Sequence, residues 1–215
     1  MLFRSIDVGN AYLEALLDVP IYMELPPEPG KPKRIVKLLK SLYGLKQAGD
    51  LWNKKLDRIL RDLGFTRTHS DACIYSRIKG ETKTYIALYV DDLLTFSNKP
   101  SELIEFEEEL AKRVKKLTIK GDAEGFVGME FKRDRKKKII TLTQSQYIKD
   151  LVHSEGLSNA TSKVTPLSST IDLTKAERGT REPMRTLVGK LRYAVDHVHP
   201  GGLYVASQLS SACAN

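Results

Sequence analysis

The chain contains 215 residues, of which 41% are hydrophobic and 29% charged, and this is enough apolar sequence for a packed core, which excludes a disordered tail. Lys and Arg number 35 against 27 Asp and Glu, and the resulting charge of +8 favours polyanionic partners, with nucleic acid first. No apolar run approaches the roughly 20 residues of a membrane span, and the first residues, MLFRSIDVGN, lack the cationic and apolar regions of a signal peptide, so we expect an intracellular protein without membrane association.

The first quarter of the chain predicts a strand, a proline-rich loop and a helix. Apolar and polar residues alternate over 2–8, the period of a half-buried strand, which places Asp7 on the face away from the core. Closely spaced prolines over 20–32 argue against a continuous ladder or helix there. From about residue 47, apolar residues at helical spacing predict an amphipathic helix that ends at Gly64.

The middle of the chain predicts a hairpin followed by a helix. Two apolar arms flank Asp91 and Asp92 between residues 84 and 97, which predicts a hairpin with these carboxylates near its tip. The next segment predicts a helix over 101–117, with Ser101 as its N-cap, apolar residues on one face and basic residues in its last turns. We expect this hairpin and helix to pack with the first predicted strand and helix.

The C-terminal part predicts a second hairpin over 125–142, with the basic run 132–138 at its tip. A short helix over 144–155 follows, and then a Ser- and Thr-rich linker over 157–181. The last predicted elements are a helix from about residue 183 to 195, a break, and a further short helix.

The carboxylates Asp7, Asp91 and Asp92 would converge if their two strands are neighbours in one sheet. Two Mg²⁺ ions about 4 Å apart, held by hard oxygen ligands, can activate a hydroxyl and stabilise both reacting oxygens of a phosphoryl transfer. An Asp-Asp pair at a turn is common by itself, because Asp favours turns. The interpretation as a metal site therefore depends on the larger pattern.

Three strings resemble, in this order, motifs A, B and C of reverse transcriptases: DVGNAY at 7–12, SLYGLKQA at 41–48 and YVDD at 89–92. With IYMELP at 21–26 before it and Trp52 after it, the middle string resembles the polymerase of Ty1/copia-type LTR retrotransposons. The resemblance continues through FVGMEF at 126–131, similar to the primer grip segment of that family, and through residues 184–209. It covers nearly the whole chain.

The resemblance implies an α+β fold, namely a reverse-transcriptase palm (an antiparallel sheet with helices on one face) plus partial fingers and thumb-like C-terminal helices. It implies a palm with partial fingers over 1–122, a primer-grip-like hairpin and first thumb-like helix over 123–156, and a linker with thumb- or connection-like helices over 157–215. The implied activity is RNA-directed DNA polymerase, which joins a dNTP to the 3′-OH of a DNA primer on an RNA template. Its implied cofactor is a pair of Mg²⁺ ions, for which Mn²⁺ can substitute.

The resemblance also implies roles for single residues. The catalytic metal ligands would be Asp7, Asp91 and Asp92, where Asp92 would bind more weakly or act only through another ligand. The residues that would contact the incoming nucleotide are Val8, Gly9, Tyr12, Tyr43, Gly44 and Lys46. Tyr12 would close on the 2′ position and exclude ribonucleotides, and Lys120 is a candidate proton donor to pyrophosphate. The remaining implied contacts are Gly128, Met129 and Glu130 in the primer grip and Lys136, Lys137 and Lys138 beside duplex phosphate.

Several alternatives stay open. Tyr12 could be an ordinary core aromatic, and the basic run 132–138 a solvated hairpin tip. The whole chain could be a nucleic-acid-binding fragment of a degenerate retroelement that does not turn over, or an unrelated palm-type nucleotidyltransferase, which SLYGLKQ disfavours. Gly49-Asp50 stand where the family has Pro-Arg, and the chain starts almost at motif A. We therefore expect a fragment that lacks the triphosphate-gripping fingers and RNase H, and catalyses poorly.

Overall fold

The computed structural model describes residues 2–166 and 181–213. They form two compact units, Met1–Val127 and Gly128–Asn215, which are described separately below. The three-part division of the chain into palm, primer-grip-like and thumb-like segments stays a prediction.

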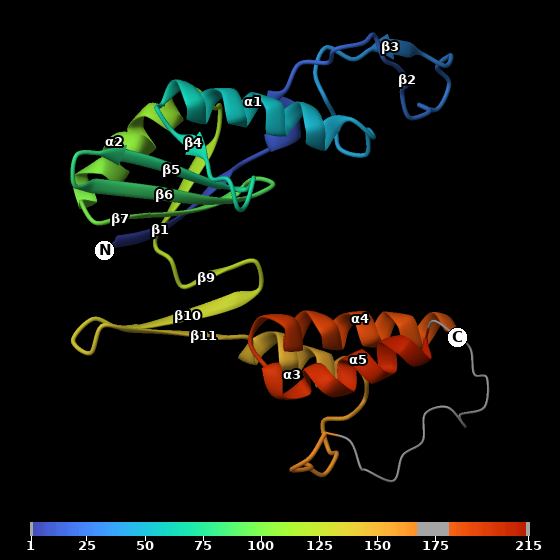
Figure 1. Cartoon of the computed structure of the whole chain (residues 1–215). Coiled ribbons are helices and arrows are strands. Elements are labelled where there is room, and N and C mark those ends of the chain that lie inside the picture. The colour runs from blue at the N-terminus through green and yellow to red at the C-terminus, as the bar shows by residue number, and fades with distance from the viewer. Residues whose placement is uncertain (1, 167–180, 214–215) are drawn as a thin grey trace. The chain divides into compact units, whose positions relative to one another are not determined.

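The first unit is built on a six-stranded antiparallel sheet with the strand order β4-β5-β6-β7-β1-β8 (Figure 1). Its strands are β1 (Leu2–Val8), β4 (Thr66–Arg67), β5 (Ile74–Lys79), β6 (Thr82–Tyr89), β7 (Asp92–Ser97) and β8 (Leu117–Asp122). The first strand of the chain lies inside the sheet, because β1 pairs with β7 on one side and with β8 on the other. The strand predicted at 2–8 and the hairpin predicted between 84 and 97 are both confirmed.

Two helices, α1 (Ala48–Asp62) and α2 (Pro100–Ala111), lie on one side of this sheet (Figure 1). Ile6 and Val8 from β1 are fully buried in one core with Trp52 of α1 and Phe106 of α2. Burying each large apolar side chain contributes roughly 1.5–3 kcal/mol, so the alternation of β1 fixes which of its faces meets the helices. The expected arrangement of an antiparallel sheet with helices on one face is present, and α1 ends before Gly64, whose φ is 82°.

The predicted helix over 101–117 is wrong at both ends. Lys99 is the N-cap and Pro100 occupies the first turn of α2, a position that suits proline because its missing N–H would be unpaired there. The helix ends at Ala111, and Leu117 instead begins β8 opposite Val8. Pairing with β1 therefore takes over the last apolar positions of the predicted helix.

A second difference lies in the proline-rich loop. The short strands β2 (Tyr22–Glu24) and β3 (Ile35–Lys37) form a two-stranded antiparallel sheet, and the 3-10 helix η1 (Ala11–Glu14) precedes them. β2 is only three residues long and fits between Pro20 and Pro26, so the prolines shorten the ladder there without preventing it.

The second unit contains a hairpin and three helices. Its elements are β10 (Met129–Asp134), β11 (Ile139–Thr143), α3 (Ser145–Ser154), α4 (Arg181–His197), η3 (Pro200–Gly202) and α5 (Leu203–Ala212), and β9 (Gly125–Phe126) precedes them. The second predicted hairpin is confirmed, and residues 135–138 form its turn. The predicted C-terminal helices are also confirmed. Of these helices, α4 packs on both α3 and α5. Residues 157–166 of the predicted linker form no helix or strand, and 167–180 lie outside the described residues.

In the part of the chain that the structure describes, every helix is too short or too polar to span a bilayer.

Candidate active site

Two of the three predicted metal ligands are neighbours at the ends of β1 and β7. The antiparallel register sets Asp7 directly opposite Asp92, and the backbone N–H of Val8 donates a 2.9 Å hydrogen bond to the carbonyl of Asp91. Directly opposite residues point to the same face of a sheet, with Cβ atoms about 4.5–5.5 Å apart. The register therefore brings together carboxylates that are far apart in the sequence.

These carboxylates lie on the sheet face opposite the helices. Ile6 and Val8 are fully buried on the helix side, and Asp7 between them points the other way and is half-buried. Asp91 and Asp92 are also half-buried, so the carboxylates can keep part of their hydration, which an uncompensated charge needs. From β8, the Nζ of Lys120 lies 3.5 Å from Oδ1 of Asp92, so this predicted proton donor contacts the carboxylate group.

The donor set at this place fits a divalent cation shared with a substrate. Among residues 2–166 and 181–213, no three His, Cys, Asp or Glu side chains are close enough to form a metal site by themselves. Asp7 and Asp92 still offer hard carboxylate oxygens from directly paired positions. Mg²⁺ is typically bound by one or two carboxylates together with waters and substrate phosphates, which suits this pair. A metal-ligand role for Asp91 stays a prediction.

The turn between β6 and β7 is held in a strained shape by α1. Val90 has a φ of 56°, which a β-branched residue rarely adopts. Its carbonyl accepts a 2.7 Å hydrogen bond from the indole Nε1 of Trp52, a side chain that is 1% exposed. In the sequence Trp52 stood out only for its helical spacing and for its place in the family resemblance. A buried indole N–H usually needs a partner, and that was the available signal for this contact.

Of the residues predicted to contact the nucleotide, Tyr12 and Tyr43 lie close together. Tyr12 and Tyr43 lie against each other, with ring centroids 4.8 Å apart, and Tyr12 also packs against the core. Both interpretations of Tyr12 are thus compatible with its position. The amide of Gly9, like that of Val8, is already used, because it donates to the carbonyl of Lys116 at 3.0 Å. The roles of Val8 and Gly9 as nucleotide contacts stay predictions, and any such contact would use groups other than these two amides.

Gly44 and Lys46 occupy the exposed segment between Tyr43 and α1. Gly44 has a φ of 92°, a left-handed conformation that suits glycine. Lys46 has no ion-pair partner among the described residues. Their contact with a nucleotide stays a prediction.

The residues predicted for the primer grip belong to the second unit. Gly128 has a φ of 70°, and a Cβ there would lie 2.5 Å from the Tyr193 hydroxyl, so both the backbone conformation and the close contact favour glycine. Glu130 accepts the backbone N–H of Gln146 at 2.8 Å, which lowers the pKa of that carboxyl and caps the start of α3. This structural role of Glu130 was not predicted from the sequence.

The predicted phosphate contacts Lys136, Lys137 and Lys138 form the turn of the β10–β11 hairpin and are exposed. The turn is shaped by its backbone, since the N–H of Lys137 donates to Oδ1 of Asp134 at 2.9 Å. The three lysine side chains are exposed. This exposure is compatible with contact to duplex phosphate and with a solvated hairpin tip.

The antiparallel sheet, its paired aspartates and the two helices behind them are compatible with a polymerase domain. Comparison with known protein families gives the same class, because residues 1–169 match the family described as reverse transcriptase (RNA-dependent DNA polymerase). The chain belongs to this reverse transcriptase family.

The similar curated proteins are transposon products, which confirms the resemblance to Ty1/copia-type Pol polyproteins. The chain is 32% identical over 210 residues to the Retrovirus-related Pol polyprotein from transposon TNT 1-94 of Nicotiana tabacum, covering 92% of this chain and 16% of that protein. Identity to the Retrovirus-related Pol polyprotein from transposon RE1 of Arabidopsis thaliana is 32% over 216 residues, covering 96% of this chain and 14% of that protein. Identity to the Putative transposon Ty5-1 protein YCL074W of Saccharomyces cerevisiae is 29%, covering 95% of this chain and 68% of that protein. The chain thus spans only a small part of the plant polyproteins.

Proposed function

We propose that this chain is the polymerase part of a Ty1/copia-type Pol polyprotein and acts inside the cell as an RNA-directed DNA polymerase. It would add dNTPs to the 3′-OH of a DNA primer on an RNA template. In this proposal the sheet of the first unit is the palm, the segment around β2 and β3 belongs to the fingers, and the C-terminal helices are thumb-like. The observation that carries the proposal is the register that pairs Asp7 with Asp92 in a member of the reverse transcriptase family.

The residues at this site divide the work of nucleotidyl transfer. Asp7 and Asp92, with Asp91 beside them, would hold Mg²⁺ or Mn²⁺, which would supply activation of the attacking hydroxyl and neutralisation of phosphate charge. Trp52 fixes the turn that carries Asp91 through its bond to Val90. Lys120 lies beside Asp92, where it can donate a proton as pyrophosphate leaves.

Primer extension on an RNA template with Mg²⁺ or Mn²⁺ tests the proposal. We expect the 215-residue chain to extend the primer, and Asp7→Asn and Asp91→Asn to lose more than about 100-fold of that activity, because each removes a charged metal ligand. Glu81→Gln is a matched control, since Glu81 is an exposed carboxylate at the opposite end of the sheet, between β5 and β6. It should extend primers at the wild-type rate.

The exposed basic turn formed by Lys136, Lys137 and Lys138 favours a second function, nucleic-acid binding without turnover. The two functions are separated by measuring primer–template binding in a gel-shift assay beside extension. Binding by the folded chain with no extension under either metal ion would overturn the polymerase proposal and support the second function.

A further inference from the structure

The segment predicted as the primer grip is fixed at both ends within the second unit. At its start, the hydroxyl of Tyr193 on α4 lies 2.5 Å from the position that a Cβ on Gly128 would occupy. At its end, the carboxylate of Glu130 accepts hydrogen bonds from the N–H of Gln146 at 2.8 Å and from the hydroxyl of Thr143 at 3.2 Å. The bonds to Glu130 join the segment to the start of α3, and the contact at Gly128 joins it to α4.

We propose that Tyr193 is a positioning residue, which sets the backbone of residues 128–130 for the primer strand through its contact with Gly128. The role toward the primer rests on the proposed function, whereas the contact is a property of the folded chain. Cζ and Cε1 of the Tyr193 ring lie 3.5 and 3.6 Å from the same Cβ position, which is ordinary van der Waals contact. The hydroxyl is thus the one group of this side chain that a Cβ would overlap.

The Tyr193 side chain is held in place by two further rings. Tyr147 of α3 lies edge-on to it with ring centroids 4.9 Å apart, and His197, one turn further along α4, lies at 4.8 Å. Edge-to-face and tilted pairs are favoured because the positive edge of one ring meets the negative face of another. A change of the Tyr193 rotamer would break both contacts, so its hydroxyl keeps its place against Gly128.

Hydrogen bonds fix both of these neighbouring rings. The Tyr147 hydroxyl donates to the carbonyl of Lys190 at 2.9 Å. Nδ1 of His197 lies 2.7 Å from the Tyr193 carbonyl, and a carbonyl can only accept, so this nitrogen carries a proton. The ammonium group of Lys190 also pairs with Glu155 at 2.8 Å, directly after α3. Two polar contacts at Lys190 therefore join α3 to α4 and support the three rings.

Packing alone is the simpler explanation for a tyrosine at this place. Tyr193 is half-buried, whereas the closely packed positions of α4 are Val188 and Ala194, each 5% exposed. The two explanations differ in what they require of Gly128. Packing requires nothing of that residue, whereas positioning requires that the effects of changes at 128 and at 193 depend on each other.

Hydrogen–deuterium exchange of the whole chain without nucleic acid tests the contact. We expect Tyr193→Ala to speed exchange of the amides over 128–130, relative to those of α5, by about 10-fold or more, because the cover of Gly128 is lost. Tyr193→Phe keeps the ring and should stay within a few-fold of wild type.

A double-mutant cycle isolates the contact from backbone strain. Gly128→Ala should also speed this exchange, since its Cβ meets the hydroxyl and since its φ of 70° disfavours a side chain. In the Tyr193→Phe background the strain stays but the overlapping atom is gone, so the effect of Gly128→Ala should be smaller by about 3-fold or more. Equal effects of Gly128→Ala in both backgrounds would overturn the proposal.

Two variants serve as controls for the exchange measurement. Val188→Ala removes buried volume from α4 away from Gly128, and Tyr204→Ala removes a tyrosine of α5 that is 69% exposed. Neither should change the exchange over 128–130, relative to α5, by more than about 2-fold. Circular dichroism melting checks that each variant is folded. A Val188→Ala variant that speeds this exchange as much as Tyr193→Ala would identify Tyr193 as a packing residue and overturn the proposal.

Primer extension supplies a readout that a merely structural role would not move. The KM of Tyr193→Ala for primer–template should rise by about 10-fold or more, while the KM for dNTP stays within a few-fold, because only the support of the primer changes. Tyr193→Phe should restore the wild-type KM for primer–template. A loss of folded protein would instead lower the apparent kcat and leave both KM values unchanged. A KM for primer–template that is equal in wild type and Tyr193→Ala would overturn the proposal.

The inference stays testable if the wild-type chain does not extend primers, which would contradict the proposed function alone. Fluorescence anisotropy then compares binding of a duplex with a recessed 3′ end and of a blunt duplex of the same length. Tyr193→Ala should weaken binding of the recessed end more than binding of the blunt duplex. Equal weakening of both, or of neither, would overturn the proposal.

Discussion

Trp52 combines packing with positioning in one side chain. Replacing it with Phe keeps most of the ring in the core but removes the donor to the Val90 carbonyl. We expect Trp52→Phe to lower the free energy of unfolding by roughly 1–3 kcal/mol, from the unpaired buried carbonyl and the lost volume. The amides of Val90 and Asp91 should exchange faster with deuterium, and primer extension should slow.

Leu56→Val is the control for Trp52→Phe, because it removes volume from the same buried helix face without touching the turn. It should destabilise the chain while amide exchange at Val90 and Asp91 stays close to wild type. If amide exchange at Val90 and Asp91 becomes faster by the same factor in both variants, Trp52 acts only through packing.

Tyr12 offers a test of sugar selection. If its ring, held against Tyr43 at 4.8 Å between centroids, covers the 2′ position of the nucleotide, Tyr12→Ala should raise ribonucleotide incorporation relative to dNTPs by about 10-fold or more. Tyr12→Phe keeps the ring and should select sugars as the wild type does. An active Tyr12→Ala variant with unchanged selection would identify Tyr12 as a core aromatic.

At the scale of elements, Arg77 joins β5 to both helices. It is 7% exposed, donates to the carbonyl of Leu63 at 2.9 Å and to Glu102 at 3.0 Å, and lies over the ring of Phe65. Arg77→Ala leaves Glu102 buried without its main partner, so it should cost about 3–5 kcal/mol in urea unfolding. Arg61→Ala, which removes a more exposed pair with Asp57, should change stability by no more than about 1 kcal/mol.

The β10–β11 hairpin carries its own prediction. Each phosphate contact contributes about 0.9 to the slope of log affinity against log salt on duplex DNA. Replacing Lys136, Lys137 and Lys138 with Ala should reduce that slope if the turn touches nucleic acid. Replacing the exposed lysines Lys31, Lys33 and Lys83 removes the same charge elsewhere and should leave the slope nearly unchanged. Equal slopes for wild type and the hairpin variant would identify a solvated tip.

Local patterns predicted most elements of this fold but not the pairings between them. The alternation around Asp7 and the arms around Asp91 were visible in the sequence, whereas the register that sets Asp7 opposite Asp92 is a tertiary contact. Val114 and Leu117 continue the apolar spacing of α2, so the sequence predicted a longer helix. In the structure Val114 reaches the core from outside the helix and Leu117 pairs with β1. Periodicity cannot distinguish these outcomes, because both bury the same side chains.

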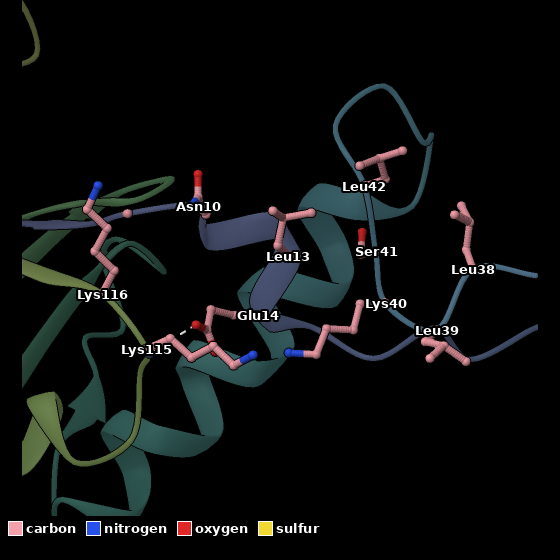
Figure 2. A pocket seen from close by; sticks show the side chains of 11 residues that line it. Asn10, Leu13, Glu14, Leu38, Leu39, Lys40, Ser41, Leu42, Lys115 and Lys116 are labelled. Carbon is pink, nitrogen blue, oxygen red and sulfur yellow. Dashed lines mark hydrogen bonds between the residues drawn. The ribbon is translucent and has the colours of Figure 1, made fainter. Parts of the chain in front are cut away.

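The candidate active site was likewise predictable from local motifs but not in its contacts between distant segments. Its carboxylates were found from motif strings, but the neighbours that shape it were not, because they act through contacts between distant segments. Ser41 was part of a motif string and Lys40 had no predicted role, and only the fold sets both in the lining of one pocket with Lys115 (Figure 2). Gly9 was predicted as a nucleotide contact, and only the fold shows that its amide donates to the carbonyl of Lys116.

For the molecule as a whole, acid should destabilise the first unit. Burial raises the pKa of Glu14, but hydrogen bonds from Lys55 and Lys115 outweigh it and lower that pKa. The pKa of Asp57 is likewise lowered, because bonds from Arg61 and Tyr75 outweigh burial. Both carboxyls bind protons more tightly in the unfolded chain, so their stabilisation is present above their ordinary pKa near 4 and is lost as the pH falls further.

Trp52 is the chain's single tryptophan, so its fluorescence in urea follows the first unit alone. The unfolding free energy should decrease between about pH 5 and 3, and Glu14→Gln with Asp57→Asn should flatten that dependence. Glu107 acts in the opposite sense, because burial raises its pKa against the opposing charge of Arg4, and its contribution is lost as pH rises through that value. An unfolding free energy independent of pH in this range would contradict the assignment.

β1 is translated before either of its partners. Its residues 2–8 pair with 92–97 and 117–122, so the centre of the sheet cannot close until β8 has left the ribosome. At about 5–20 residues per second this delay is roughly 5–25 s, during which the hairpins can form but Ile6 and Val8 have no partner strand. Such non-local pairing slows folding and leaves an apolar segment open to aggregation. Shielding of residues 2–8 in the nascent chain, by a chaperone or by the tunnel wall, would thus govern how much of this protein reaches its native state.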